Sequence, residues 1–166
     1  MQPQQLHDLI IKPTLEYMGG NYYSKESAFL LLATAAIESD CGYYIKQING
    51  PALGVWQMEP ATHEDIWKNC DALQSEFGEI TRNLAPAYSK LADNDLIDTP
   101  KYACAMARLK YSMDPYPLPK LTGDNNADLR AFFDYYKRVY NTGLGASTFD
   151  KWSVSLSKHK IWNVKL

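Results

Sequence analysis

The sequence predicts an all-α protein, or one that is nearly all-α. Apolar residues recur with helical spacing along almost the whole chain. Several of these runs begin at residues that favour helix starts, such as Ser24, Pro60 and Thr99-Pro100. No segment combines strand-like alternation with a tight turn, so no β-hairpin is expected. With 166 residues and no internal repeats, the chain should form a single domain, residues 1–166, around one hydrophobic core.

The first expected helix carries apolar side chains between residues 6 and 15. Pro13 has no backbone N–H to donate, so the helix should be kinked or restarted there. The pair Gly19-Gly20 is placed to close it.

The second expected helix is the most apolar part of the chain. Ser24 is a good N-cap, and Glu26 lies in the first turn, where the helix dipole favours an acid. Residues 28–37 are apolar on most of the helix circumference, which is typical of a helix at the centre of a bundle. Gly42 is placed to end this helix.

An irregular loop over residues 43–56 should separate the central helix from the rest of the chain, because it holds Gly50-Pro51 and Gly54. Proline-rich residues 114–119 and the stretch Asn141-Thr142-Gly143-Leu144-Gly145 should each end a helix. The helices expected beyond the loop cover residues 60–70, 76–92, 100–113 and 128–140, and a last one starts near Thr148.

The overall charge excludes some classes of partner. The formal net charge is -2 and the pI is near 5.9, whereas bulk nucleic-acid binding usually requires a basic surface. No apolar run approaches the roughly 18 residues of a membrane span, so no stable membrane insertion is expected. A basic cluster near the C-terminal end favours a solvated helix face and tail, although it could face an anionic polymer; it comprises Lys151, Lys158, His159, Lys160 and Lys165.

Cysteine usage and the first residues bear on the compartment. Cys41, Cys70 and Cys104 are odd in number and have no metal-ligand spacing, so we expect small core residues in a reducing compartment, with a disulfide as the alternative. Residues 1–5 lack the basic and apolar regions of a signal peptide. The sequence therefore predicts synthesis in the cytoplasm without a signal peptide.

Glu38 is the first candidate for chemistry, because it lies in the last turn of the apolar central helix. Burial there would disfavour the charged carboxylate and raise its pKa, as a general acid working near neutral pH requires. The negative end of the helix dipole acts in the same direction. The alternative is a solvent-exposed carboxylate at a helix C-terminus.

Two further segments carry groups suited to binding a sugar. After Gly54, Gln57 could hydrogen-bond an N-acetyl or hydroxyl group, and Trp56 offers a ring face for a sugar. The alternative is a turn that places Trp56 in the core. Tyr140 and Asn141, at the end of the aromatic helix, could support the acid or a substrate oxygen, or could form only a helix C-cap.

Three segments in this order resemble the soluble-lytic-transglycosylase type of lysozyme-like domain. That family has a Glu-Ser pair at the end of a core helix, then a Gly-Leu-Met-Gln-x-x-Pro-x-Thr segment, and later a Tyr-Asn-Ala-Gly segment. The corresponding segments here are Glu38-Ser39, Gly54-Val55-Trp56-Gln57-Met58-Glu59-Pro60-Ala61-Thr62 and Tyr140-Asn141-Thr142-Gly143. The match spans residues 28–145, and the shared order adds specificity that no single motif has.

The resemblance implies a lysozyme-like helical fold and cleavage of the β-1,4 bond between N-acetylmuramic acid and N-acetylglucosamine in peptidoglycan. Glu38 would protonate the leaving oxygen and then take a proton from the muramoyl 6-hydroxyl, which attacks C1 and closes a 1,6-anhydro ring. Gln57 or Asn141 would hold the 2-acetamido group, and Ser39 and Tyr140 would orient the acid or that group.

The sequence departs from the family pattern at three places. Trp56 replaces the family's methionine, and Glu59 stands where an apolar residue is common. The segment 102–108 stands in place of the family's Gly-x-x-Tyr-Leu. These departures concern the contacts of individual subsites rather than the role of Glu38.

Two other functions fit the same pattern. A hydrolytic lysozyme or chitinase on this fold would need, if inverting, a second carboxylate about 6.5–9.5 Å from the first. Glu59 is the strongest candidate, and Asp40 and Asp65 are the others. A catalytically silent phage-particle or wall-binding component is the alternative from a different class, because fold does not imply activity.

The expected partners are peptidoglycan glycan strands, without nucleic acid, and other virion or lysis proteins are further candidates. No cofactor is expected. No metal site is expected either, because His7, His63 and His159 are far apart and form no ligand pair. Short variants without a signal peptide resemble domains of phage particles and prophages. Action at the bacterial wall would then require delivery by a holin, a virion or a fused partner.

Overall fold

Helices are the ordered elements of the computed structural model, which describes residues 1–86, 92–141 and 145–166. These residues contain no β-strand, only isolated bridges that join Leu53 to Lys46 and to Met58. The prediction of an all-α protein is therefore confirmed. The loop that contains the bridges follows the central helix, where an irregular segment was expected.

The N-terminal helix passes through Pro13 by means of a widened turn. It consists of α1 (Pro3–Leu6), the π-helical η1 (His7–Ile11) and α2 (Lys12–Met18). The N–H of Lys12 bonds to the carbonyl of His7, five residues back. This wide turn directly precedes the proline, which has no N–H of its own to donate. The helix ends at Gly19, whose φ of 76° suits glycine, so both expectations for this element are confirmed.

Helix α3 (Lys25–Ser39) is the buried centre of the fold. Ser24 and Ser27 form a reciprocal capping box, and every residue from Ser27 to Ala36 is buried. The expected end at Gly42 was wrong, because the helix already stops at Ser39. Asp40 takes a left-handed conformation with φ of 55°, which aspartate tolerates better than most side chains.

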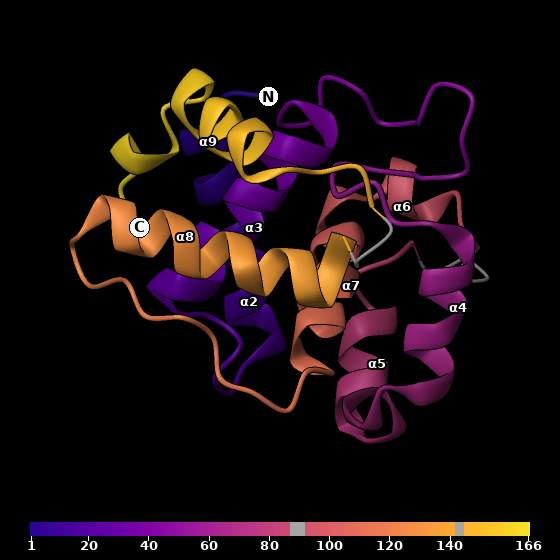
Figure 1. Cartoon of the computed structure of the whole chain (residues 1–166). Coiled ribbons are helices and arrows are strands. Elements are labelled where there is room, and N and C mark those ends of the chain that lie inside the picture. The colour runs from indigo at the N-terminus through magenta and orange to yellow at the C-terminus, as the bar shows by residue number, and fades with distance from the viewer. Residues whose placement is uncertain (87–91, 142–144) are drawn as a thin grey trace.

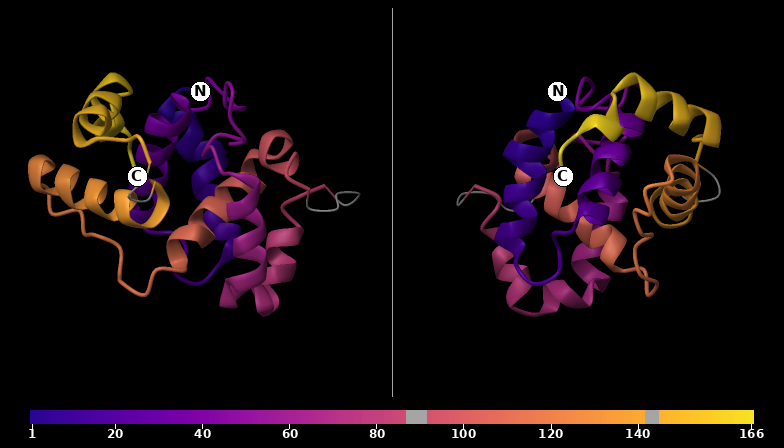
Figure 2. Two further views of the ribbon diagram at one scale, coloured as in Figure 1. Left: turned by 45° about the vertical axis from the view of Figure 1, so that its right-hand side comes forward. Right: turned by 90° about the vertical axis from the view of Figure 1, so that its left-hand side faces the viewer.

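Figure 1 shows the other helices arranged around α3. Helix α8 crosses in front of it, α9 lies above, and α7 packs beside it. The views in Figure 2 place α8 and α9 on one side of α3, and α4 and α5 on the other. The C-terminal end of α3 therefore lies where these two groups of helices and the loop after α3 come together.

The middle of the chain is built from short helices. They are α4 (Pro60–Asn69), the 3-10 turn η2 (Asp71–Gln74), α5 (Glu76–Arg82), α6 (Asp95–Asp98) and α7 (Pro100–Ser112). The expected helix over 76–92 was too long, since α5 ends at Arg82, before Pro86; positions 87–91 lie outside the described residues. Helices α4 and α7 both begin at a proline, as predicted.

The C-terminal part consists of α8 (Asn125–Tyr136), the π-helical η3 (Lys137–Asn141), α9 (Phe149–Lys158) and the 3-10 turn η4 (Ile161–Asn163). Helix α8 starts earlier than the expected residue 128, because Asp124 accepts bonds from the N–H groups of Asn126 and Ala127. Asp128 instead accepts bonds from the preceding loop. The expected stop at 142–144 lies outside the described residues, and Thr148 caps α9 as predicted.

Cys41, Cys70 and Cys104 are buried and free, so the prediction of core residues is confirmed. Burial raises the pKa of Cys41 to about 11, which leaves the thiol protonated and unreactive at neutral pH. Within the described residues, no helix is long and apolar enough to cross a membrane.

Candidate active site

Glu38 lies in the last turn of α3 and is half-buried. Burial raises the pKa of its carboxyl, which is the direction the sequence predicts. Hydrogen bonds from Tyr136 and Asn141 and the nearby charge of Lys137 oppose this, because each favours the carboxylate. Desolvation is the largest of these effects, so the carboxyl keeps its proton to higher pH than an exposed glutamate.

The closest polar partner of Glu38 is a tyrosine that the sequence analysis did not single out. The hydroxyl of Tyr136 donates to Glu38 Oε1 over 2.5 Å, and it lies 2.9 Å from Ser147 Oγ. A phenol has one proton, so when Glu38 is ionised Tyr136 donates to it and Ser147 donates to Tyr136. Tyr136 precedes Tyr140 by four residues, and this helical spacing was the only sequence signal for its position.

Tyr140, the motif tyrosine, acts on the site less directly. Its hydroxyl donates to the backbone carbonyl of Trp56 over 2.9 Å and so links η3 to the loop after α3. The ring lies between those of Tyr111 and Tyr136, with centroids 5.2 and 6.4 Å away and near-parallel planes. Trp152 continues the stack beyond Tyr136 at 4.8 Å. These stacked rings restrict the position of the Tyr136 hydroxyl.

Lys137 fixes the orientation of the Asn141 side chain. Its ammonium donates to Asn141 Oδ1 over 2.7 Å and to the carbonyl of Gly145 over 2.6 Å. With the amide oxygen occupied, the amide nitrogen is the group that faces Glu38. The sequence analysis did not find Lys137, because a lysine on an exposed helix turn usually lies in solvent.

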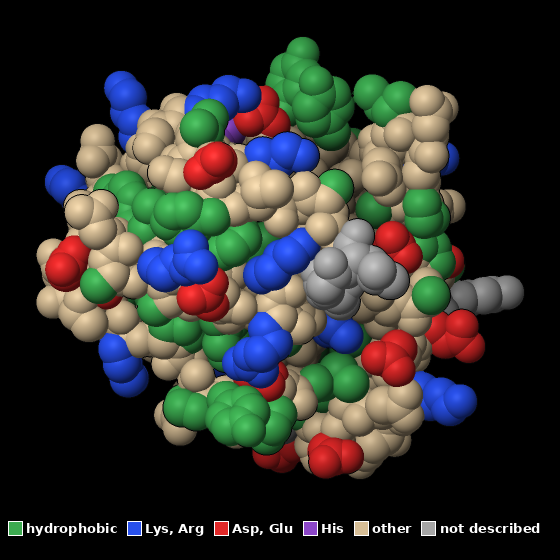
Figure 3. Space-filling model, in the orientation of Figure 1, with side chains coloured by type: hydrophobic (Ala, Val, Ile, Leu, Met, Phe, Trp, Pro, Cys, Tyr) green, Lys and Arg blue, Asp and Glu red, His purple; other side chains and the backbone are tan. Residues whose placement is uncertain are grey.

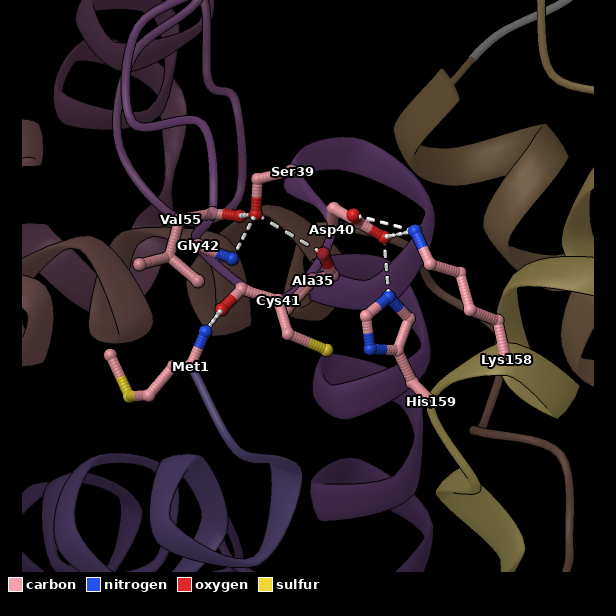
Figure 4. A network of polar contacts seen from close by, with 9 residues as sticks. All are labelled: Met1, Ala35, Ser39, Asp40, Cys41, Gly42, Val55, Lys158 and His159. Atoms are coloured by element: carbon pink, nitrogen blue, oxygen red, sulfur yellow. Dashed lines mark hydrogen bonds and ion pairs between the residues drawn. The ribbon is translucent and has the colours of Figure 1, made fainter.

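Ser39 supports the backbone rather than a substrate, which corrects its expected role in binding. It is only 1% exposed. Figure 4 shows its hydroxyl between the carbonyls of Val55 and Ala35 and the N–H of Gly42. The hydroxyl donates to Val55 and accepts from Gly42, so it ties the end of α3 to the following loop.

Trp56 is also part of the scaffold, so its expected role as a sugar platform was wrong. The side chain is 1% exposed, and its indole N–H donates to the carbonyl of Leu31 over 3.0 Å. Both ring faces therefore pack against protein atoms. The alternative that the sequence left open, a turn that places Trp56 in the core, is the one observed.

Gln57 remains available to a ligand. Its amide nitrogen donates to the carbonyl of Gly54 over 2.7 Å, and its oxygen, at the wall of a cavity, accepts no hydrogen bond from the part of the chain that the structure describes. Gly54 has a φ of 75°, and a Cβ there would lie 2.1 Å from the carbonyl oxygen of Leu96. Glycine is therefore required for the loop to approach α6 so closely.

Two hollows open at Glu38. The first has a volume of about 420 Å³ and is lined by Gln57, Glu59, Tyr140 and Asn141 among others. The second, of about 430 Å³, lies between the end of α3 and α9. Glu38, Ala146 and Ser147 line both, so the carboxyl lies where the two hollows meet.

The other carboxylates differ in their relation to Glu38. Glu59 is exposed and lines the first hollow with it. Asp40 lines the second hollow, but it accepts from Lys158 at 2.6 Å and from His159 at 2.5 Å (Figure 4). These partners, Lys158 first, hold the pKa of Asp40 low, and two members of the basic cluster are thereby engaged. Asp65 lines neither hollow and accepts from Asn69.

In the part of the chain that the structure describes, no three side chains of His, Cys, Asp or Glu gather to hold a metal ion. No protein-family model, curated protein or solved structure matches the chain. The lysozyme-like family stays a prediction from the sequence motifs, of which Thr142 and Gly143 lie outside the described residues.

Proposed function

We propose that the protein cleaves the β-1,4 bond between N-acetylmuramic acid and N-acetylglucosamine of peptidoglycan, without water, and that Glu38 is both acid and base. One observation carries the proposal: Glu38 lies where two open hollows meet. The raised pKa of its carboxyl and the contact with a tyrosine hydroxyl support it. A polymer that occupied both hollows would present an internal bond to this carboxyl.

The reaction would proceed in two proton transfers. Protonated Glu38 gives its proton to the glycosidic oxygen as the C1–O bond breaks, and it becomes a carboxylate. This carboxylate then takes the proton of the muramoyl 6-hydroxyl, whose oxygen bonds to C1 and closes the 1,6-anhydro ring. Glu38 ends protonated as it began, so no water and no second carboxylate are consumed. Tyr136 and Asn141 would stabilise the carboxylate between the two steps.

The polar groups of the first hollow suit an N-acetylated sugar. The free oxygen of Gln57 can accept from the acetamido N–H. Asn141 is held toward Glu38 by Lys137, so we assign it to the acid rather than to the acetamido group. Holding the acetamido group against C1 would shield positive charge there without a protein nucleophile.

A hydrolase is the second candidate function, and one observation favours it. Glu59 lines the same hollow as Glu38 and could activate a water as general base. In the second hollow, Asp40 is bound by Lys158 and His159 and is a poorer base for this purpose.

Mass spectrometry of the products released from purified peptidoglycan tests the proposal. We expect muropeptides one water lighter than the reducing-end forms and no oxygen-18 incorporation from labelled water. Glu38→Gln should abolish release, with a loss of at least about 10³-fold, because the amide can neither give nor take the proton. Glu59→Gln, the matched control, should retain the wild-type products.

The other outcomes are equally informative. Reducing ends labelled with oxygen-18, lost in Glu59→Gln, would establish the hydrolase and contradict the proposed mechanism. Glycan binding without release by either wild type or Glu38→Gln would instead identify a catalytically silent wall-binding component.

A further inference from the structure

The second hollow differs in chemistry from the first. It lies beyond Glu38, between the end of α3 and one face of α9, and Ile37, Tyr44 and Val154 give it an apolar and aromatic lining. Tyr44 is 47% exposed and packs edge-on against Tyr43, with ring centroids 4.8 Å apart. In Figure 3, hydrophobic side chains gather over the loop that follows α3, next to basic side chains over α9.

The two hollows also differ in the charge of the residues that line them. The first is lined by Glu59 and Lys110, so its charges other than Glu38 balance. The second holds Asp40, Lys151 and Lys158 besides Glu38, so with Glu38 again set aside it has one positive charge in excess. Asp40 and Lys158 bind each other, with both carboxylate oxygens 2.6 Å from the ammonium (Figure 4). The excess charge therefore resides on Lys151.

Lys151 has donors left for a ligand. Its ammonium makes one hydrogen bond of 3.2 Å, to the carbonyl of Ala146, and forms no ion pair within residues 1–86, 92–141 and 145–166. Two of its three protons are therefore available. Ala146 itself lines both hollows, so this ammonium is held beside the point where they meet.

We propose that the second hollow binds a carboxylate-bearing substituent of the glycan, with Lys151 as its counter-charge and Tyr44 as its apolar wall. This inference rests on the proposed function and specifies its substrate. Strands that carry peptides with free carboxylates fit the hollow, whereas a neutral glycan of N-acetylglucosamine alone leaves Lys151 without a partner. Lys151 is then a specificity-determining residue, without a part in bond cleavage.

The test compares two soluble ligands that differ only in charge. One is a tetrasaccharide of N-acetylglucosamine and N-acetylmuramic acid that carries peptides, and the other is the same molecule with its carboxylates converted to carboxamides. Binding is measured by calorimetry in the Glu38→Gln background, so that no cleavage occurs. We expect the carboxylate form to bind roughly fivefold more tightly, as for one exposed charge pair, and salt to reduce the difference.

Three variants complete the design. Lys151→Gln should remove the preference and leave binding of the carboxamide form unchanged, and Lys151→Glu should reverse the preference. Lys101→Gln, the matched control, makes the same change in net charge at an exposed residue in the first turn of α7 and should behave as wild type. The Lys151 side chain is exposed, so its replacement should leave thermal unfolding unaltered.

Equal binding of the two ligands by wild type, or equal effects of Lys151→Gln and Lys101→Gln, would overturn the inference. Failure of the proposed function looks different. Lys151-dependent binding by a protein that releases no glycan products would support the binding site and contradict the enzyme. Anhydro products without any charge preference would support the enzyme and contradict the site.

Discussion

The candidate site has two sides: the end of α3 with the loop that follows it, here called the loop side, and α8 with η3, here called the helical side. Both supply motif residues, but their polar side chains make different contacts. On the loop side, Ser39 and Trp56 bond to the carbonyls of Val55 and Leu31, and both are buried. On the helical side, the side chains of Tyr136 and Asn141 bond to the carboxyl of Glu38. The loop side therefore stabilises the backbone around the site, and the helical side influences the protonation of Glu38.

This difference shows that residue type alone does not separate a ligand contact from a scaffold contact. Serine and tryptophan are common in sugar sites, yet here their hydrogen-bonding groups are fully used inside the protein. A buried polar group needs a partner wherever it lies, and the backbone is the nearest source of one. Variants on the loop side should consequently lower the stability of the protein, and variants on the helical side should lower its activity.

The largest effect should come from Trp56→Ala, on the loop side. It removes a fully buried ring and leaves the Leu31 carbonyl without the indole donor. We expect a loss of about 3–5 kcal/mol in the free energy of unfolding, measured by urea denaturation. Trp56→Phe keeps most of the ring volume and should cost about 1–2 kcal/mol. Unchanged stability of Trp56→Ala with lost glycan binding would restore tryptophan as a sugar platform.

The next largest effect should come from Tyr136→Phe, on the helical side. The change deletes the 2.5 Å bond to Glu38 and retains the ring that stacks between Tyr140 and Trp152. A hydrogen bond to a charged group is worth about 1.5–3 kcal/mol, so the rate of glycan cleavage should fall roughly 10- to 100-fold. Stability should change little, because phenylalanine occupies the same space.

Tyr140→Phe is the control for this prediction. Its hydroxyl bonds to the Trp56 carbonyl and not to Glu38, so activity should fall less than in Tyr136→Phe. If Tyr140→Phe were the more damaging of the two for activity, the motif tyrosine would act on the substrate directly. The assignment of Tyr136 to the acid and of Tyr140 to the scaffold would then be wrong.

Local signals predicted most of the fold. Ser24, Pro60 and Thr148 begin helices α3, α4 and α9 as expected, because capping and N1 preferences involve only neighbouring residues. The errors arose where tertiary contacts decide. Asp124 and Asp128 are equally good caps by sequence, and only packing against the loop that holds Thr122 assigns Asp128 to another role.

The candidate site was predicted only in part, because some of its features follow from local sequence and others from tertiary contacts. The burial of Glu38 follows from the apolar run before it, which is local information. The burial of Trp56 depends on Leu31, 25 residues earlier, and the role of Lys137 depends on where η3 ends relative to Gly145. The widened turn of η3 shifts the register of the aromatic helix, and the periodicity of the sequence gave no sign of it.

The smallest effect should come from Lys137→Met, which tests whether the helical side tunes the acid. Lys137 lowers the pKa of Glu38 by its charge and orients Asn141, which also lowers it. Removing the ammonium should therefore raise the pKa of Glu38 further. A carbon-13 NMR titration of the Glu38 carboxyl measures this in the free protein, whether or not glycan is cleaved.

The kinetic consequence has a definite sign. Glu38 acts first as an acid, so the falling limb of activity at high pH should move to higher pH in Lys137→Met. Weaker restraint of Asn141 should lower the rate at the optimum roughly fivefold, for a loss of about 1 kcal/mol. Lys110→Met is the control: it removes a lysine that lines the first hollow but should leave the Glu38 titration unchanged, because Lys110 is not among the causes of its shift. If both variants moved the titration equally, the mere number of positive charges near Glu38, rather than the Lys137–Asn141 contact, would set the acidity of Glu38.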